Sequence, residues 1–215
     1  MSLNVNQTAM ATTPWDQFFA AKIRAIFSSS KLIIDIGGGL RISKDKSNRF
    51  DPSRAWIIPL TQQIDYKILD PVDTYHPDIV GDIHHLPLAD DSTDAIICLA
   101  VLEHVENPLV AVQEIRRVLK PGGRCLLYVP FLYYYHAEPG YYRDYWRFSH
   151  DALKLLLKDF STVEIQPVRG AIETLVRLSP LGRRRLWISL GGLLDRLTGK
   201  VKSKQVSGYY VFAVK

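Results

Sequence analysis

The sequence predicts a doubly wound α/β fold, in which a mostly parallel sheet carries helices on both faces. Short apolar runs typical of buried parallel strands alternate along the chain with helical patterns. The first run passes through Asp35 into three consecutive glycines, and the next two runs end at Asp70 and Asp82. Because the carboxyl ends of parallel strands meet at one edge of a sheet, these residues are expected to share one ligand site.

The composition fits one domain that spans residues 1–215. The chain is 47% hydrophobic and 23% charged, which is ordinary for a soluble globular protein. Cys98 and Cys125 lie inside apolar runs, which indicates buried thiols in a reducing compartment. The sequence shows neither the apolar core of a signal peptide nor a run long enough to span a membrane, so a cytoplasmic location is expected. Residues 1–12 are polar without periodicity and are expected to be disordered.

Capping residues and apolar periods place the main elements. Thr13-Pro14 begins a first helix and Asn107-Pro108 another, because a polar N-cap followed by proline is typical of a helix start. Ser149 or His150 begins a third. The polar, basic stretch 41–54 is expected to be an extended loop. The seven expected strands are 32–35, 66–69, 78–82, 94–100, 124–129, 161–168 and 208–214.

The stretch LIIDIGGG at 32–39 is the centre of the predicted site. Glycines at a strand end let the backbone approach a ligand closely. Asp35 can accept hydrogen bonds that fix the turn, or it can face a positively charged cofactor. Asp70, at the tip of the second strand, can accept from both hydroxyls of a ribose. A dinucleotide fingerprint requires a further glycine near position 42, and Ile42 stands there, which disfavours a nicotinamide dehydrogenase.

The ordered motifs resemble those of the class I S-adenosylmethionine-dependent methyltransferases, in the branch called type 11. The motifs cover about residues 31–130 and are DIGGG at 35–39, the acid Asp70, GDIHHLPL at 81–88, LEHV at 102–105 and RVLKPGG at 117–123. This resemblance implies a Rossmann-like seven-stranded sheet with an antiparallel last strand. It also implies S-adenosyl-L-methionine as the cofactor.

The resemblance further implies a role for each cofactor residue. The glycine turn would contact the cofactor, with Asp70 on the ribose, Asp82 at the adenine amino group and Ile83 against the ring. The full implied set is Asp35, Gly37, Gly38, Gly39, Asp70, Asp82, Ile83 and Ala100. His84 and His85 are adjacent, so they point apart, and no partner stands at ligand spacing; no metal site is therefore expected.

An aromatic segment follows the fifth strand, with six tyrosines and one tryptophan between positions 133 and 146. Such side chains pair an apolar body with a polar group and suit a pocket for the methyl acceptor; the alternative is a loop that merely closes the core. The candidate acceptor-binding residues are Tyr135, Tyr142, Asp144, Trp146 and Arg147. His136 is the first candidate for a catalytic base and His104 the second, although either histidine can instead be structural.

The segment from His136 to Ser149 resembles methyltransferases of bacterial surface-polysaccharide gene clusters. This implies a sugar or lipid-linked glycan acceptor. Methyl transfer depends mainly on positioning, which contributes about 7–11 kcal/mol, because the sulfonium methyl is already activated. A general base adds roughly 3–5 kcal/mol. The sequence leaves open whether oxygen, nitrogen or carbon is methylated and whether a base is needed.

A basic, leucine-rich stretch departs from the minimal fold as a variable helical insertion at 170–207. Residues 177–204 hold eight basic residues and one acid, Asp195. The apolar stripe is formed by Leu186, Leu190, Leu193 and Leu197. Three interpretations arise: a helix covering the sheet end or a homodimer face, a segment resting on anionic lipid, and a nucleic-acid contact. The third ranks last, and no nucleic-acid partner is expected, because no recognised module accompanies the charge.

The sequence thus predicts a methyltransferase acting on an unidentified acceptor. The alternative from another functional class is a non-catalytic protein that binds the cofactor and serves as an assembly or interaction partner through 170–207. The intact glycines and acids favour retained cofactor binding in either case.

Overall fold

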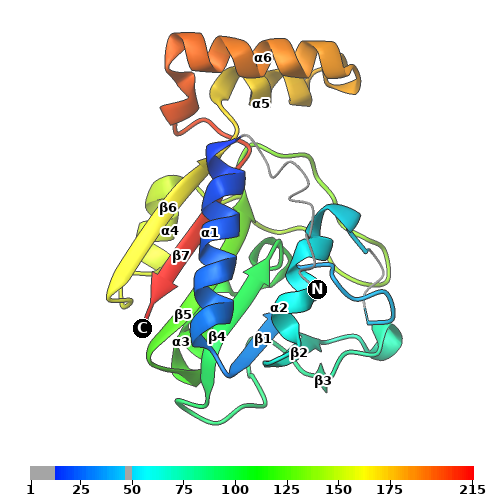
Figure 1. Cartoon of the computed structure of the whole chain (residues 1–215). Helices are drawn as coiled ribbons and strands as arrows, with labels where there is room; N and C mark the ends of the chain where they lie inside the picture. Colours follow the sequence, from blue (N-terminus) through cyan, green and yellow to red (C-terminus); the bar gives the residue numbers. More distant parts are fainter. Residues whose placement is uncertain (1–12, 47–49) are drawn as a thin grey trace, which may run out of the picture.

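The computed structural model describes residues 13–46 and 50–215, and a seven-stranded sheet forms its centre (Figure 1). The expectation for residues 1–12 lies outside this range. The strand order is β3-β2-β1-β4-β5-β7-β6. Neighbours from β3 to β5 pair in parallel, whereas β7 is antiparallel to both β5 and β6. The strands are β1 Leu32–Ile36, β2 Asp65–Asp70, β3 Ile79–Val80, β4 Thr93–Leu99, β5 Leu119–Pro130, β6 Thr162–Val168 and β7 Gly208–Val214. The predicted fold class is confirmed.

Helices cover both faces of this sheet, as Figure 1 shows for α1 in front and α3 behind. Alternate residues of a strand point to opposite faces. Ile33 accordingly belongs to the core cluster that includes the buried residues of α1, while Ile34 belongs to the cluster that includes those of α3 and α4. Both cysteines are free and buried between these layers, as predicted. The helices are α1 Pro14–Ser29, α2 Ile58–Thr61, α3 Pro108–Val118, α4 His150–Leu156, α5 Ala171–Leu178 and α6 Arg185–Thr198.

Caps set the helix starts at the predicted positions. The side chains of Thr13, Asn107 and Ser149 each accept a hydrogen bond from a backbone N–H in the first turn of α1, α3 and α4. The boundaries of two strands differ from prediction by more than one residue. Strand β3 ends at Val80, because Asp82 forms a bridge with His85 in the following turn. Strand β5 begins five residues earlier than predicted, with an irregular register opposite the start of β4.

Helices α5 and α6 form a hairpin between β6 and β7, beyond the carboxyl edge of the parallel strands (Figure 1). Helix α6 runs continuously through Gly191. A Cβ at Gly191 would lie 3.1 Å from Glu173 Cα, so this glycine lets the two helices approach closely. The four stripe leucines remain 40–75% exposed, so α6 does not bury them against the sheet. None of the described helices has the length and hydropathy needed to cross a membrane.

Candidate cofactor and acceptor site

The glycine turn lies tightly against the end of β4. Gly37 and Gly38 adopt positive φ angles of 75° and 58°, which favour glycine. A Cβ on Gly37 would lie 2.7 Å from Val101 Cγ2, and one on Gly39 would lie 2.7 Å from the Leu99 carbonyl oxygen. The backbone N–H of Gly37 donates to the Leu69 oxygen at 2.7 Å. The turn is therefore held between β2 and β4, with no room for a side chain at Gly37 or Gly39.

Asp35 is buried beneath this turn. Its Oδ2 accepts hydrogen bonds from the Leu40 N–H at 3.0 Å and from the Tyr66 hydroxyl at 2.6 Å. Its Oδ1 accepts none within the described chain. Burial raises the pKa of Asp35 to about 6, against the lowering effect of the Tyr66 hydrogen bond. Of the two roles left open by the sequence, the geometry supports fixing the turn.

The register of β1 and β2 brings Asp70 beside the glycine turn, because Ile36 pairs with Leu69. One Asp70 oxygen accepts from the Val72 N–H at 2.9 Å, and burial raises the pKa of this carboxyl. Ala100, the residue after β4, reaches the same edge in a left-handed conformation with φ 56°. Such strain in a non-glycine residue is typical of functional sites.

Asp82 and Ile83 lie in the turn that follows β3 and not in the strand itself. The Asp82 Oδ1 accepts from the His84 N–H at 2.8 Å and pairs with His84 Nδ1 at 2.7 Å. The Asn107 N–H lies 3.2 Å from His84 Nε2, so this histidine joins two loops. Ile83 is only 5% exposed and packs in the core. Its predicted contact with an adenine ring would thus involve little accessible surface.

The two candidate catalytic histidines meet in space although they lie far apart in the sequence. Their ring centroids lie 4.8 Å apart, edge to face, and the Tyr142 ring lies 4.3 Å from His104. Burial lowers the pKa of His104, whereas interaction with Glu103 raises the pKa of His136. The acceptor loop, residues 131–149, therefore folds back onto the end of β4.

Asp144 and Arg147 hold this acceptor loop together. The Asp144 side chain is fully buried and accepts from Arg147 Nη2 at 2.7 Å and from the His136 N–H at 2.8 Å. The hydrogen bond from Arg147 is the main reason that the pKa of Asp144 falls to about 2. Arg147 also donates to the Tyr134 carbonyl at 2.6 Å. Both residues, predicted as acceptor ligands, are thus engaged within the loop and position His136.

The remaining predicted acceptor residues differ in exposure. Tyr135 is 76% exposed, and Trp146 is exposed while its Nε1 donates to the Val105 carbonyl at 2.9 Å. Tyr142 is half-buried, and its hydroxyl donates to Glu138 at 3.0 Å. Tyr134 was not among the predicted acceptor-binding residues. Its hydroxyl donates a hydrogen bond to the Arg177 carbonyl at 2.6 Å. This bond joins the acceptor loop to the α5–α6 hairpin.

Glu103 is a candidate site residue that the sequence-based prediction missed. It lies between the two candidate histidines with 1% exposure, and neither carboxylate oxygen accepts a hydrogen bond within the described residues. From the sequence, Glu103 was recognised only as a member of the LEHV motif at 102–105. An acid next to a histidine within an apolar stretch was the signal that could have found it.

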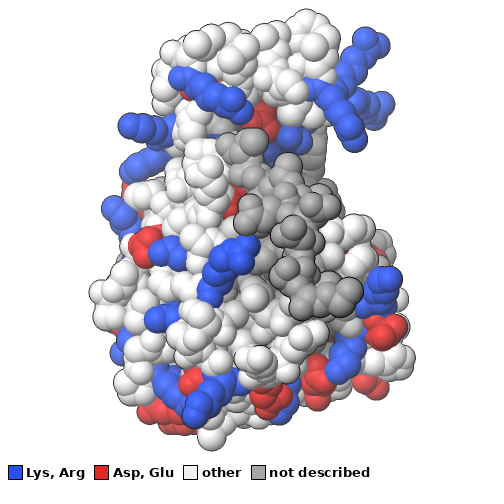
Figure 2. All heavy atoms as spheres, viewed as in Figure 1, with Lys and Arg blue, Asp and Glu red and all other residues white. Residues whose placement is uncertain are grey.

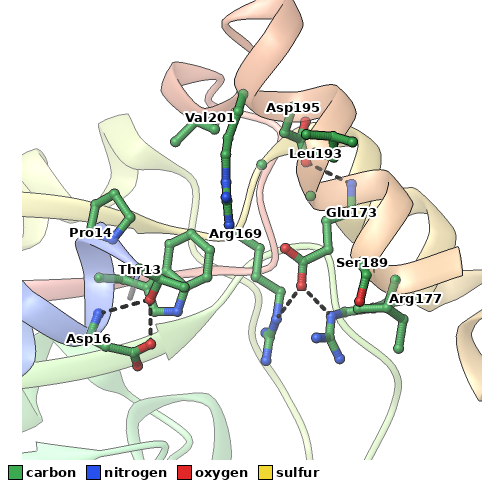
Figure 3. Close-up of a pocket in the computed structure, with 15 residues that line it drawn as sticks. Thr13, Pro14, Asp16, Arg169, Glu173, Arg177, Ser189, Leu193, Asp195 and Val201 are labelled. Atoms are coloured by element: carbon green, nitrogen blue, oxygen red, sulfur yellow. Dashed lines mark hydrogen bonds and ion pairs between the residues drawn. The ribbon is translucent and has the colours of Figure 1, made fainter. Parts of the chain in front are cut away.

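A separate pocket of about 840 Å³ lies between the start of α1 and the α5–α6 hairpin (Figure 3). Three of its charged side chains form ion pairs: Glu173 Oε1 lies 2.8 Å from Arg177 Nε and 3.5 Å from Arg169 Nε. Asp195 accepts from the Ile172 and Glu173 N–H groups, both at 2.8 Å, which caps α5. The pocket contains none of the predicted cofactor residues. We interpret it as the junction that fixes the hairpin.

Comparison with known proteins finds a match to a methyltransferase family model and several relatives that are named as methyltransferases. Residues 60–127 match the family model described as a methyltransferase domain. The chain is 46% identical over 52 residues to the human thiol S-methyltransferase TMT1B, covering 24% of this chain and 19% of that protein. It is 26% identical over 132 residues to a tRNA U34 carboxymethyltransferase of Nautilia profundicola, covering 54% of this chain and 40% of that protein. The chain spans 15–22% of the length of the first three curated relatives it matches.

Solved structures extend the likeness to nearly the whole fold. A SAM-dependent methyltransferase of Archaeoglobus fulgidus aligns with a TM-score of 0.59 at 15% identity, covering 93% of this chain and 94% of that chain. A Burkholderia thailandensis 1,6-didemethyltoxoflavin-N1-methyltransferase, with S-adenosylhomocysteine bound, aligns with a TM-score of 0.52 at 16% identity, covering 91% and 76%. The chain has the fold of the class I SAM-dependent methyltransferases. The family match and this fold together support a SAM-dependent methyltransferase.

Proposed function

We propose that the protein transfers the methyl group of S-adenosyl-L-methionine to an acceptor at the carboxyl edge of its sheet. One observation carries the proposal: the glycine turn, Asp70 and Ala100 converge at the edge where β1, β2 and β4 end. The matched methyltransferase model supports it. The bound S-adenosylhomocysteine of the Burkholderia protein, which shares this fold, supports the choice of cofactor.

The residues at this edge fit the proposed cofactor. Gly37 and Gly39 leave no Cβ against Val101 and Leu99, so the turn packs closely on the strand end where we propose that the cofactor binds. We assign Asp70 to the ribose hydroxyls, because only one of its oxygens is committed to a described hydrogen bond, from Val72. We assign Asp82 to the adenine amino group. When bound, the cofactor supplies an activated methyl group.

Replacing Asp70 with alanine tests this assignment. Binding of S-adenosylhomocysteine should weaken by roughly 1.5–3 kcal/mol, which is the range for a hydrogen bond to a charged group. Isothermal titration calorimetry measures the change. Asp73→Ala removes an exposed acid three residues further along and should leave affinity unaltered. Equal affinities of the wild type and a folded Asp70→Ala protein would remove Asp70 from the cofactor site.

The acceptor side is assigned to the loop after β5. His136 and His104 are the proposed catalytic residues, because their rings meet beside the end of β4. Asp144 and Arg147 position His136 and hold the acceptor loop closed over this edge. The arrangement can exclude water and direct a nucleophile toward the methyl group, which is the main requirement of the reaction. We propose a hydroxylated acceptor of the sugar or lipid-linked glycan class.

The α5–α6 hairpin favours an acceptor presented at a membrane surface. Its exposed apolar residues include Trp187 besides the four stripe leucines. Figure 2 shows basic side chains at the sides of the hairpin and an uncharged surface along its outer edge. An apolar face bordered by basic residues is typical of helices that lie on anionic lipid. The Tyr134 hydroxyl links this hairpin to the acceptor loop, so docking would bring that loop to the membrane.

A vesicle assay distinguishes membrane docking from a homodimer. Replacing Arg183, Arg184 and Arg185 with serine should weaken binding to anionic vesicles roughly 100-fold, at about 1 kcal/mol for each basic residue near the surface. Co-sedimentation should also show loss of wild-type binding as salt rises. Serine at Lys31, Lys154 and Lys158 is the matched control, since these exposed lysines lie outside the hairpin. If the wild-type protein does not co-sediment with anionic vesicles at low salt, membrane docking is contradicted. A dimer that Leu190→Asp dissociates would then explain the exposed leucines.

A further inference from the structure

Three side chains with metal-binding atoms converge beside the proposed acceptor site. Glu103 and His104 lie in the 3₁₀ turn Leu102–His104 that follows β4, and His136 lies in the acceptor loop. The Glu103 Oε1 is 3.8 Å from His104 Nε2 and 3.6 Å from His136 Nε2. The three ligand atoms all lie within 4.8 Å of one another. We propose that Glu103, His104 and His136 bind a divalent transition-metal cation that receives the acceptor's oxygen.

The first argument is the burial of Glu103. Its carboxylate is 1% exposed, and neither oxygen accepts a hydrogen bond within the described chain. A buried carboxylate without a hydrogen bond or a positive partner is strongly unfavourable. Its close ion-pair contacts in the described structure are the two imidazoles. At 3.6 and 3.8 Å, these contacts are too long to be hydrogen bonds.

The second argument is the orientation of the two rings. His104 Nδ1 lies 2.6 Å from the Arg143 carbonyl oxygen, and His136 Nδ1 lies 3.0 Å from the Tyr134 carbonyl oxygen. A carbonyl oxygen can only accept, so each Nδ1 must carry the proton and donate it. The neutral rings then hold their lone pairs on Nε2, the atom that faces Glu103. Metal-bound histidines show this pattern, with the second ring nitrogen donating to a carbonyl or carboxylate.

The donor set indicates the kind of cation. Two imidazole nitrogens and one carboxylate suit Zn²⁺, Mn²⁺, Fe²⁺ or Co²⁺, whereas Mg²⁺ prefers oxygen ligands. Bonds of about 2.1 Å at tetrahedral to octahedral angles separate ligand atoms by roughly 3.0–3.4 Å. The two carboxylate–imidazole distances, 3.8 and 3.6 Å, exceed this separation by less than about 1 Å. The farthest pair of ligand atoms, which lies within 4.8 Å, has to approach by up to about 1–2 Å when a cation binds. Three protein ligands leave further coordination positions open for an acceptor.

The position of the site at the end of β4 suggests its use, and this step rests on the proposed methyltransferase function. A cation there would favour an acceptor hydroxyl with a neighbouring oxygen, such as a vicinal diol or a hydroxy acid, because two oxygens can coordinate together. Coordination lowers the pKa of the hydroxyl, and its proton leaves to solvent. The oxygen then bonds to the methyl carbon as the carbon–sulfur bond breaks, and that electron pair remains on sulfur.

Metal titration of untagged, chelator-stripped protein tests the site directly. Calorimetry should show one equivalent of Zn²⁺, Mn²⁺ or Co²⁺ bound, with Mg²⁺ at least roughly 100-fold weaker. The Co²⁺ complex should also give visible absorption bands. Glu103→Gln and His136→Ala should each lower the affinity by at least tenfold. Glu106→Gln and His150→Ala remove the same groups from exposed or half-buried positions outside the cluster and should bind metal as the wild type does.

The outcomes separate this site from the proposed function. Thermal melting first verifies folding, and His104→Asn replaces any ligand variant that fails to fold. Wild-type protein without saturable metal binding, or ligand variants with unchanged affinity, would overturn the metal site. Affinity for S-adenosylhomocysteine is measured on the same samples. Metal binding without cofactor binding would overturn only the methyltransferase proposal, and cofactor binding without metal binding would overturn only the metal site.

Discussion

Replacing Gly39 with alanine should lower the free energy of unfolding by about 2–3 kcal/mol, because overpacking a rigid site costs about that much. The new Cβ would lie 2.7 Å from the Leu99 oxygen and 2.8 Å from Leu99 Cβ. Leu99 ends β4 at the centre of the sheet, so its backbone cannot move aside cheaply. The turn would instead shift outward and lose its alignment with Asp70. We expect S-adenosylhomocysteine affinity to fall at least roughly tenfold, equivalent to about 1.4 kcal/mol.

Gly192→Ala is the matched control, because it adds the same Cβ methyl group as Gly39→Ala at a different glycine. In α6, the added Cβ would meet only the end of the Glu173 side chain, at 3.3 Å. Alanine is also favoured over glycine inside a helix. Calorimetry and thermal melting should therefore show unchanged cofactor affinity and equal or higher stability. A Gly39→Ala protein with wild-type melting and affinity would show that the turn is looser than its contacts indicate.

Replacing Asp35 with asparagine should stabilise the protein at neutral pH and not at pH 4. Burial raises the folded-state pKa of Asp35 from 3.8 to about 6. The folded chain therefore holds this proton more tightly than the unfolded chain does. Stability from Asp35 is greatest below pH 3.8 and is lost as pH rises through 6. A shift of about two pH units corresponds to roughly 3 kcal/mol, and the amide of the Asp35→Asn variant, which does not titrate, cannot incur this loss.

Denaturant titrations at several pH values between about 4 and 7.5 measure this difference. The advantage of Asp35→Asn should grow with pH and level off above about 6. Tyr66→Phe is the informative companion, because it removes a hydroxyl that donates to Asp35 at 2.6 Å and so lowers its pKa. That variant should lose more stability with rising pH than the wild type. An Asp35→Asn protein less stable than the wild type at neutral pH would mean that the charged carboxylate stabilises the turn.

Local sequence patterns predicted most of the fold. Apolar runs and caps depend on near neighbours, so strands such as Gly208–Val214 and the start of α1 could be placed from sequence alone. The glycine turn could be recognised in the sequence because Asp35 and the three glycines stand next to one another. The α5–α6 contact was less predictable. Gly191 in α6 makes room for α5, and that neighbouring helix cannot be identified from the residues around Gly191. A glycine inside a helix weakens a sequence-based prediction of one continuous helix.

The acceptor side depends on contacts between distant segments. Glu103 approaches His136 only because the loop after β5 folds back, held through the Asp144 carboxylate. The spacing of residues in the sequence does not indicate that this loop folds back toward Glu103. In the sequence, only His84 and His85 suggested a metal site, because these two residues are contiguous. Cys98 and Cys125, in contrast, needed only their apolar neighbours to be predicted as buried.

The internal place of β7 has a consequence for biosynthesis. Residues 208–214 pair with β5 on one side and β6 on the other. Until they have left the ribosome, both neighbouring strands present open edges, which are prone to pair with other chains. The sheet can therefore close only after the α5–α6 hairpin has been translated. Nascent chains that stall before residue 208 should be poorly folded clients of chaperones rather than a smaller working domain.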